Sequence, residues 1–162
     1  MIKLSEINKA INKIIVSSIE ESDVFADYFD GNPIAGDNSP DPIAGDIIRF
    51  NRPAIKVSFD NIQTGRTINS KNRSLTVRIY FFAKDMHKYK IDNMNMEELI
   101  EDAFNDGIFV RDDCYIYVDE IYTDVVNSVL VCSFDLETLE EINRDIDAEP
   151  LEELDLNIKK EE

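Results

Sequence analysis

Few residues in this 162-residue sequence carry the side chains that catalysis usually needs. The sequence has a single histidine, His87, and two cysteines, Cys114 and Cys132. These three side chains could bind zinc, but they lack the Cys-x-x-Cys or His-x-x-x-His spacing of zinc sites. His87 lies in the basic stretch KDMHKYK, which is typical of an exposed segment, and both cysteines are typical of small buried apolar residues in a reducing compartment. We therefore expect no metal centre and no catalytic histidine.

Adjacent carboxylates are the second group of side chains that could do chemistry. Asp112–Asp113 and Asp119–Glu120 could hold Mg²⁺, as the carboxylates of nucleases do. A chain with 34 acidic residues produces such pairs by chance, however, and Asp112–Asp113 is more typical of a turn. Candidates for an acid–base pair or an activated nucleophile are equally sparse. The sequence therefore predicts neither an enzyme nor a cofactor, and an enzyme is the third choice among the function classes.

Residues 33–46 read PIAGDNSPDPIAGD, so the same pentapeptide occurs twice. The aspartates of this stretch lack the alternating oxygen ligands and the closing glutamate of a calcium-binding hand. A phosphate-binding loop would open a helix, whereas the following IIRFNRPAIK does not have a helical pattern. The repeated unit is also too short for a solenoid, and two copies are too few. We interpret residues 28–53 as a long exposed loop, and contact with a partner through this loop stays open.

Two segments have the apolar spacing of amphipathic helices. The first covers residues 5–21, with Ser5 as the expected N-cap. Its apolar stripe consists of Leu4, Ile7, Ile11, Ile14, Ile15 and Ile19. The second covers residues 94–105, and Gly107 is a natural stop signal after it. We expect both helices to pack on a sheet.

Alternation of apolar and polar residues predicts strands at residues 55–59 and 73–85, separated by a turn-rich gap at residues 60–72. In the second strand, one face carries Leu75, Val77, Ile79 and Phe81. The opposite face carries two aromatic residues, Tyr80 and Phe82, beside Arg78, which is unusual for a solvated surface. The sequence therefore predicts an interface with another subunit or another protein at Arg78, Tyr80 and Phe82. The alternative is that the loop of residues 28–53 covers this face and makes both aromatic residues part of the core.

Residues 108–142 are rich in Ile, Val, Tyr and Phe and predict a meander of three strands. The expected reversals are Asp112–Asp113 and Asn127–Ser128. The resulting fold class is α+β, with a mostly antiparallel sheet and two amphipathic helices packed on one face. We expect one domain over residues 1–141, followed by an acidic C-terminal extension over residues 142–162.

The formal net charge of −17 argues against binding to nucleic acid, because such binding needs cations that neutralise phosphates. Residues 135–162 carry 12 of the 34 acidic side chains and only 3 of the 17 basic ones. About half of the excess negative charge therefore lies in the last sixth of the chain. The N-terminal stretch has neither the apolar core of a signal peptide nor a run long enough to span a membrane. We expect a cytosolic protein without a membrane partner.

Several stretches together resemble the tail terminator proteins of long-tailed bacteriophages and phage-tail-like particles. They are the N-terminal LSEINKAINKII, the strand RPAIKVSF, the strand NRSLTVRIYFFAKD, the helix MNMEELIEDAF and the closing VVNSVLVCSFDLE. In that family the middle strand commonly reads Arg-Ser and then alternating apolar residues with an aromatic pair, which Arg73–Ser74 and Phe81–Phe82 match. The resemblance covers residues 4–140. The loop at residues 28–53 is longer than the family pattern, and the acidic extension is additional.

The resemblance implies a virion structural protein that is not an enzyme. It implies a homo-oligomeric ring, a hexamer, that caps the tail tube and forms the head-tail connection to a neck or connector protein. A sheath protein would be a further partner in a contractile tail, and the genome would pass through the ring without specific binding. The protein would be assembled in the cytoplasm of the host bacterium and lie at the neck end of the virion tail.

The competing class is an acidic monomeric binding or inhibitor module whose carboxylates imitate the phosphates of DNA. The net charge of −17 supports this class. The concentration of that charge in the C-terminal extension opposes it, because a DNA mimic needs carboxylates spread over the folded body. The mass of the particle in solution distinguishes the ring from the monomer.

Overall fold

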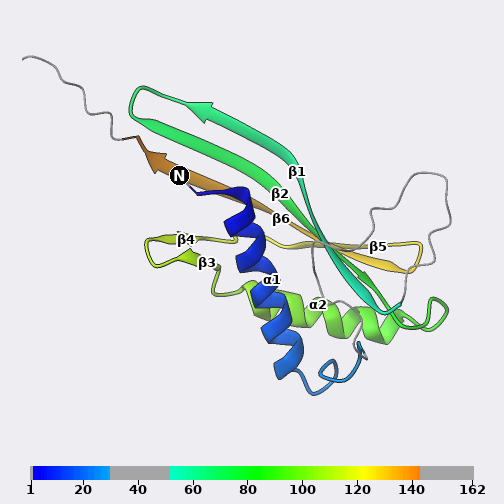
Figure 1. The fold of residues 1–162 in the computed structure, drawn as a ribbon. Helices are drawn as coiled ribbons and strands as arrows, with labels where there is room; N and C mark the ends of the chain where they lie inside the picture. Colours follow the sequence, from blue (N-terminus) through cyan, green and yellow to red (C-terminus); the bar gives the residue numbers. More distant parts are fainter. Residues whose placement is uncertain (1, 30–51, 143–162) are drawn as a thin grey trace, which may run out of the picture.

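The computed structural model describes residues 2–29 and 52–142. In these ranges the chain forms two helices and six strands, arranged in a larger and a smaller sheet (Figure 1). The elements in chain order are α1 (Leu4–Glu21), β1 (Ala54–Arg66), β2 (Ser70–Phe82), α2 (Lys90–Phe104), β3 (Ile108–Arg111), β4 (Cys114–Ile116), β5 (Tyr122–Val126) and β6 (Val129–Glu141).

The larger sheet is antiparallel and has the strand order β1-β2-β6-β5. β2 and β6 pair along their whole length, from Phe82 opposite Val129 to Ser70 opposite Glu141. β5 is shorter and pairs only with residues 129–133 of β6. Along the rest of β6, no strand within the described ranges pairs on the β5 side. The sheet is therefore wider at the β5 end than at the opposite end.

Both helices lie on the same face of the larger sheet (Figure 1), and the core fills the space between the helices and the sheet. Four isoleucines spaced by one helical turn are 0% exposed on α1: Ile7, Ile11, Ile15 and Ile19. The strands β2 and β6 contribute Leu75, Val77, Ile79, Phe81, Leu130, Cys132, Phe134 and Leu136. Full burial of one such side chain stabilises the fold by about 1.5–3 kcal/mol. The predicted α+β fold class is confirmed. We call the helix-covered face the inner face and the face that carries Arg78, Tyr80 and Phe82 the outer face.

The helix ends differ from the sequence expectation in detail. The predicted N-cap at Ser5 is wrong, because α1 begins at Leu4 and Lys3 is its N-cap residue. The backbone N–H of Lys3 donates to the side chain of Glu6 over 2.7 Å, the N3-to-N-cap contact of a capping box. The second helix begins at Lys90, earlier than predicted. Its C-terminus is as predicted: Gly107 has a φ of 72° and follows the last turn.

The ribbon of β1 and β2 is longer than the sequence pattern indicates. The expected turn-rich gap at residues 60–72 is wrong, since β1 continues to Arg66 and β2 begins at Ser70. A β-bulge after Asp60 includes Asn61, whose φ is 51°. A bulge inserts an extra residue and so interrupts the period-two alternation by which a strand is recognised.

The C-terminal strands also depart from the expected meander of three strands. β3 and β4 pair with each other as the smaller sheet, and β3 contacts α1. The predicted single strand at residues 114–126 is wrong, because residues 117–121 are not part of a strand and separate β4 from β5. Val118 is buried in the core there, so the chain turns inward between the two strands. The reversals at Asp112–Asp113 and Asn127–Ser128 are confirmed.

The segment directly after α1 packs on the core, which the sequence analysis missed. Phe25 and Phe29 are buried, and their rings make edge contacts with the ring of Phe81 at centroid distances of 5.9 Å and 6.4 Å. The hydroxyl of Tyr28 donates to Asp92 at the start of α2 over 2.6 Å. Burial, together with this hydrogen bond, raises the pKa of Tyr28. The segment therefore joins α1, β2 and α2.

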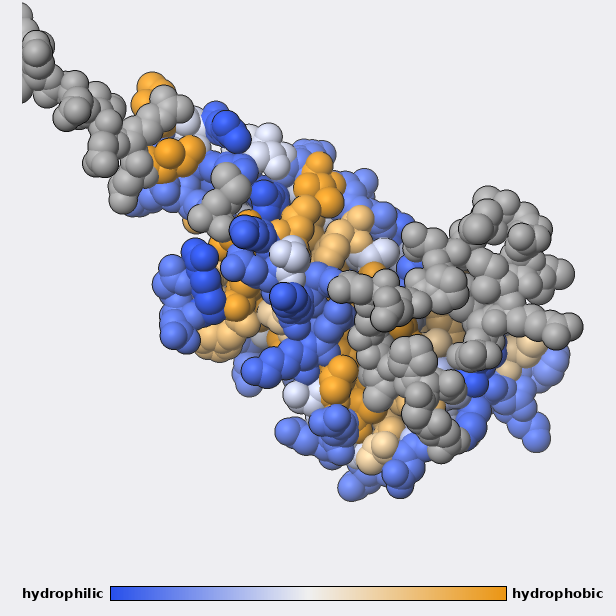
Figure 2. All heavy atoms as spheres, in the orientation of Figure 1, coloured by the Kyte–Doolittle hydropathy of each residue, from blue (hydrophilic) through white to orange (hydrophobic). Residues whose placement is uncertain are grey.

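Most of the predicted loop at residues 28–53, with its PIAGD repeat, lies outside the described residues, and so does the predicted acidic extension after residue 142. Neither α1 nor α2 is long and apolar enough to cross a membrane. The side of the molecule seen in Figure 2 is mainly hydrophilic, and apolar surface shows in patches between the hydrophilic side chains.

Candidate interface on the outer face of the sheet

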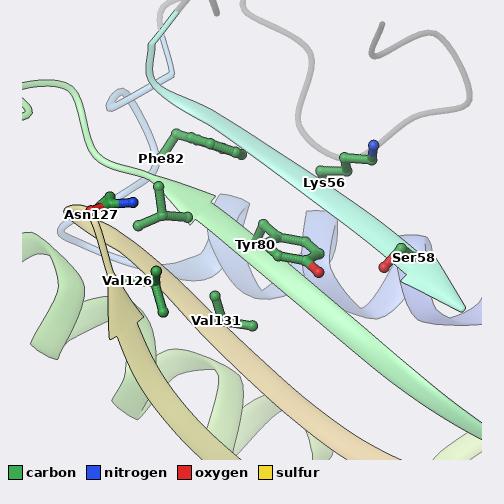
Figure 3. A pocket seen from close by; sticks show the side chains of 8 residues that line it. Lys56, Ser58, Tyr80, Phe82, Val126, Asn127 and Val131 are labelled. Atoms are coloured by element: carbon green, nitrogen blue, oxygen red, sulfur yellow. The ribbon is translucent and has the colours of Figure 1, made fainter. Parts of the chain in front are cut away.

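An open groove of about 390 Å³ lies on the outer face at the β5 end of the larger sheet (Figure 3). All four strands of that sheet and the turn between β5 and β6 contribute to it. The lining residues are Lys56, Ser58, Tyr80, Phe82, Val126, Asn127, Val129 and Val131. Most of these side chains are apolar, so the groove presents chiefly aliphatic and aromatic surface. We refer to this feature as the groove.

Strand alternation brings Tyr80 and Phe82 into the groove. Phe81 lies between them and is 0% exposed on the inner face, so its two neighbours must point outward. Tyr80 is paired with Val131 of β6, and Phe82 is paired with Val129. Residues directly opposite in neighbouring strands share one face of the sheet, so the two aromatic rings and the two valines form one continuous surface. Tyr80 and Phe82 are both half-buried.

A tight turn forms one end of the groove. Asn127 and Ser128 have φ angles of 50° and 69°, as the two central residues of a type I′ hairpin turn require. The turn places Val126 opposite Val129, and the side chain of Val126 is 52% exposed. The carbonyl of Ser128 accepts a hydrogen bond from the side-chain amide of Asn93 on α2 over 3.5 Å. The end wall of the groove is therefore fixed to the helical layer.

Cationic side chains surround the groove on its β1 and β2 side. Lys56 lines it, and Arg78 lies one position further along the same face, 3.4 Å from Asp60. The guanidinium carbon of Arg52 lies 5.8 Å from the centroid of the Phe82 ring, within the range of a cation–π contact. The apolar floor therefore has a positively charged border.

Basic and acidic residues are segregated along the chain, which the net charge alone does not show. Residues 52–90 carry nine basic and two acidic side chains, whereas residues 91–142 carry one basic and 15 acidic side chains. The ribbon of β1 and β2 is therefore basic, and the part of the chain from α2 to β6 is acidic. This segregation was not predicted; the charge was expected to differ only between the body and the C-terminal extension.

The structure brings two of the three predicted interface residues together. Tyr80 and Phe82 lie in the groove, and Arg78 lies beside it on the same face. Their role at an interface stays a prediction. The sequence analysis missed Val129 and Val131, although their alternation with buried residues of β6 was a usable signal. What the sequence could not provide was the strand order that places β6 beside β2.

Beyond Arg78 the outer face becomes polar. Ser74 and Thr76 of β2 are paired there with Glu137 and Asp135 of β6. The hydroxyl of Thr76 donates to Asp135 over 2.6 Å. These side chains already satisfy one another or contact water, so this part of the face has less to gain from a partner than the groove has.

The histidine and the two cysteines, which could have bound a metal, do not lie together at one site. His87 is exposed and Cys132 is buried on the inner face, while Cys114 is only partly buried, contrary to expectation, because it lies in the smaller sheet. Burial raises the pKa of the Cys132 thiol to about 12, with a smaller contribution from the carboxylate of Glu97. Burial also raises the pKa of Cys114. Within residues 2–29 and 52–142, no group of three or more His, Cys, Asp or Glu side chains is arranged to hold a metal ion.

A profile of the family described as "Phage tail terminator protein" matches residues 36–148, which include every strand and α2. No curated protein matches the sequence significantly. Among solved structures, a chain from the "Virion of native gene transfer agent (GTA) particle" aligns with a TM-score of 0.45 and 8% sequence identity, over 83% of this chain and 97% of that chain. Because the family profile spans more than half of the sequence, the protein belongs to the phage tail terminator protein family.

Proposed function

We propose that this protein ends the tail tube of a phage or phage-tail-like particle as a ring of identical copies. In this proposal the ring is a hexamer, caps the last ring of the tube protein and joins the tube to a neck or connector protein. A sheath protein is a further neighbour if the tail is contractile. Family membership supports the coarser part of this role, a structural function in the virion tail.

The observation that carries the proposal is the groove on the outer face. An apolar surface with two half-buried aromatic rings is unfavourable in water and favourable against another protein. Aromatic anchors at protein–protein contacts can contribute about 2 kcal/mol or more each, whereas truncating a solvated side chain usually changes stability by less than about 0.5 kcal/mol. We therefore assign Arg78, Tyr80 and Phe82 to the contact with a neighbouring subunit or with the tube.

The proposal includes passage of the genome through the ring without specific binding. A net charge of −17 repels phosphates, and the acidic carboxylates of the chain outnumber its basic groups two to one. A lumen that repels DNA lets the genome slide. The proposal requires no enzymatic step and no cofactor, and it places the protein at the neck end of the tail after assembly in the host cytoplasm.

A DNA-mimicking inhibitor is the second candidate, and the charge segregation of the described residues opposes it. A mimic needs rows of carboxylates across its folded body. Residues 91–142 carry 15 acidic side chains, but residues 52–90 carry nine basic side chains and only two acidic ones, so the carboxylates do not extend over the whole body. A basic stretch of this kind does not imitate the phosphates of DNA.

The length of the tails tests the proposed function. We expect that particles assembled without this gene carry tubes of variable and excessive length that lack heads, as seen by negative-stain electron microscopy. Supplying the wild-type gene in trans restores one length and head attachment. Tails of normal length joined to heads in the absence of the protein would refute the proposal.

A further inference from the structure

We propose that the groove of one copy holds the β3–β4 hairpin of the next copy, so that one repeated contact builds the ring. The inference rests on the proposed ring and names the occupant of the groove. It follows from a second exposed surface on the same chain, whose shape and charge complement the groove.

Three exposed aromatic side chains lie on the β3–β4 hairpin or directly after it. Phe109 is 70% exposed, Tyr115 is 48% exposed, and Tyr117 is 64% exposed. Phe109 is paired with Tyr115 across the hairpin, and the ring centroids lie 4.9 Å apart with edge contact. A single exposed aromatic residue needs no explanation, but a pair of exposed rings in contact, with a third exposed aromatic residue next to them in sequence, is typical of a contact surface.

The aromatic cluster is held in place before any partner binds. The hydroxyl of Tyr115 donates to the carbonyl of Asp106 over 2.6 Å. Gly107 has a φ of 72°, and a Cβ atom at this position would lie 2.5 Å from the Tyr115 oxygen. Glycine therefore allows the backbone to approach the ring closely. A surface fixed in this way loses little conformational entropy when it docks.

The charge of the hairpin complements the border of the groove. Its tip is Asp112–Asp113, and the only cation of the hairpin, Arg111, lies 2.6 Å from Asp113. Asp119 and Glu120 follow the hairpin and add further negative charge. The groove is bordered by Lys56, by Arg52 over the Phe82 ring and by Arg78, which is paired with Asp60. Docking would thus place an acidic tip and aromatic rings against an apolar floor with a cationic border.

The two surfaces are different and lie on different parts of the chain. The groove is on the outer face at the β5 end, whereas the hairpin lies on the helix side and contacts α1 (Figure 1). A contact between two different patches is heterologous, so each copy keeps a free groove and a free hairpin until the assembly closes. A ring requires this kind of contact. An isologous dimer would use the same patch twice.

The first experiment removes the hairpin surface from the purified full-length chain. Phe109→Ser with Tyr117→Ser changes two exposed side chains, so the fold should persist. We expect at least about a 30-fold weakening of self-association in sedimentation velocity. The matched control, Ile91→Ser with Met94→Ser, removes side chains on α2 that are 72% and 62% exposed and should leave self-association unchanged.

The second experiment mixes two variants that cannot assemble alone. Tyr80→Ser with Phe82→Ser disables the groove; if this variant does not fold, Val126→Glu at the exposed wall of the groove replaces it. The groove variant keeps an intact hairpin, and the hairpin variant keeps an intact groove. A heterologous contact therefore predicts a one-to-one dimer in the mixture that grows no further, measured by mass photometry.

Three results would overturn the inference. The hairpin variant could associate like the wild type, which would assign the groove to the tube protein or to another segment of the chain. The mixture could remain monomeric although both variants are folded. The wild type could remain monomeric at every concentration, which would exclude this self-contact while the tail-length experiment still decides the proposed function independently.

Discussion

The two faces of β2 differ most clearly at Phe81 and Phe82, which are adjacent and chemically identical. Phe81 is 0% exposed and contacts the rings of Phe25 and Phe29 on the inner face. Phe82 is half-buried on the outer face, and the guanidinium of Arg52 approaches its ring. An apolar residue on a strand therefore indicates burial only when another layer covers its face. On the outer face, the same residue type indicates a surface that another molecule can cover.

Truncating these two phenylalanines is the strongest way to test the difference between the faces. We expect Phe81→Ala to lower the free energy of unfolding by about 3–5 kcal/mol, because it leaves a cavity in a close-packed core. Phe82→Ala should lower it by only about 1 kcal/mol, because its ring is already partly in contact with water. Urea denaturation measures both values. Equal losses would show that the outer face is core as well.

Salt should have a smaller effect, and it should change self-association but not folding. If a basic groove border meets an acidic hairpin tip, raising the salt concentration from 50 mM to 500 mM should weaken self-association about tenfold by screening. The melting temperature should change little, since the core is apolar. Sedimentation velocity at both salt concentrations measures the first quantity, and thermal unfolding measures the second. Association that strengthens with salt would indicate a purely apolar contact.

The smallest expected effect concerns the ion pair beside the groove. Arg78 and Asp60 are 43% and 40% exposed at a distance of 3.4 Å, so their interaction should contribute at most about 1 kcal/mol to folding. A double-mutant cycle with Arg78→Ala and Asp60→Ala measures this coupling. If Arg78 serves the interface, Arg78→Ala should weaken association more than it weakens folding. The opposite ranking would make Arg78 a structural residue.

The sequence predicted the parts of the fold that depend on periodicity. The isoleucines of α1 and the alternating residues of β2 have a strong period; α1 begins one residue before its predicted start, and β2 begins and ends three residues before its predicted bounds. The outward position of Tyr80 and Phe82, which line the groove, was predicted from the same alternation. Gly107 and Asn127–Ser128 were recognisable because their positive φ angles favour specific residue types.

The remaining features depend on long-range packing or on local breaks in the pattern. The bulge after Asp60 interrupts the alternation of apolar and polar residues, so the second half of β1 had the sequence pattern of a turn. Val118 is buried in the core between β4 and β5, so the single strand that the sequence predicted is interrupted there. The β3–β4 hairpin therefore forms a sheet separate from the larger one. The valines of the groove lie on β5 and β6, which are far from β2 in sequence, so only the strand order brings them to Tyr80 and Phe82.

The most direct test of the central claim, that the groove is an assembly surface, is tail termination by the double variant Tyr80→Ser with Phe82→Ser. The control variant, Ser74→Ala with Thr76→Ala, changes the polar part of the same face. We predict that the groove variant melts within about 5 °C of the wild type, forms no rings and yields tubes of uncontrolled length, while the control variant terminates tails normally. If the groove variant unfolds, Val126→Glu replaces it; a folded groove variant that terminates tails at the normal length contradicts the claim.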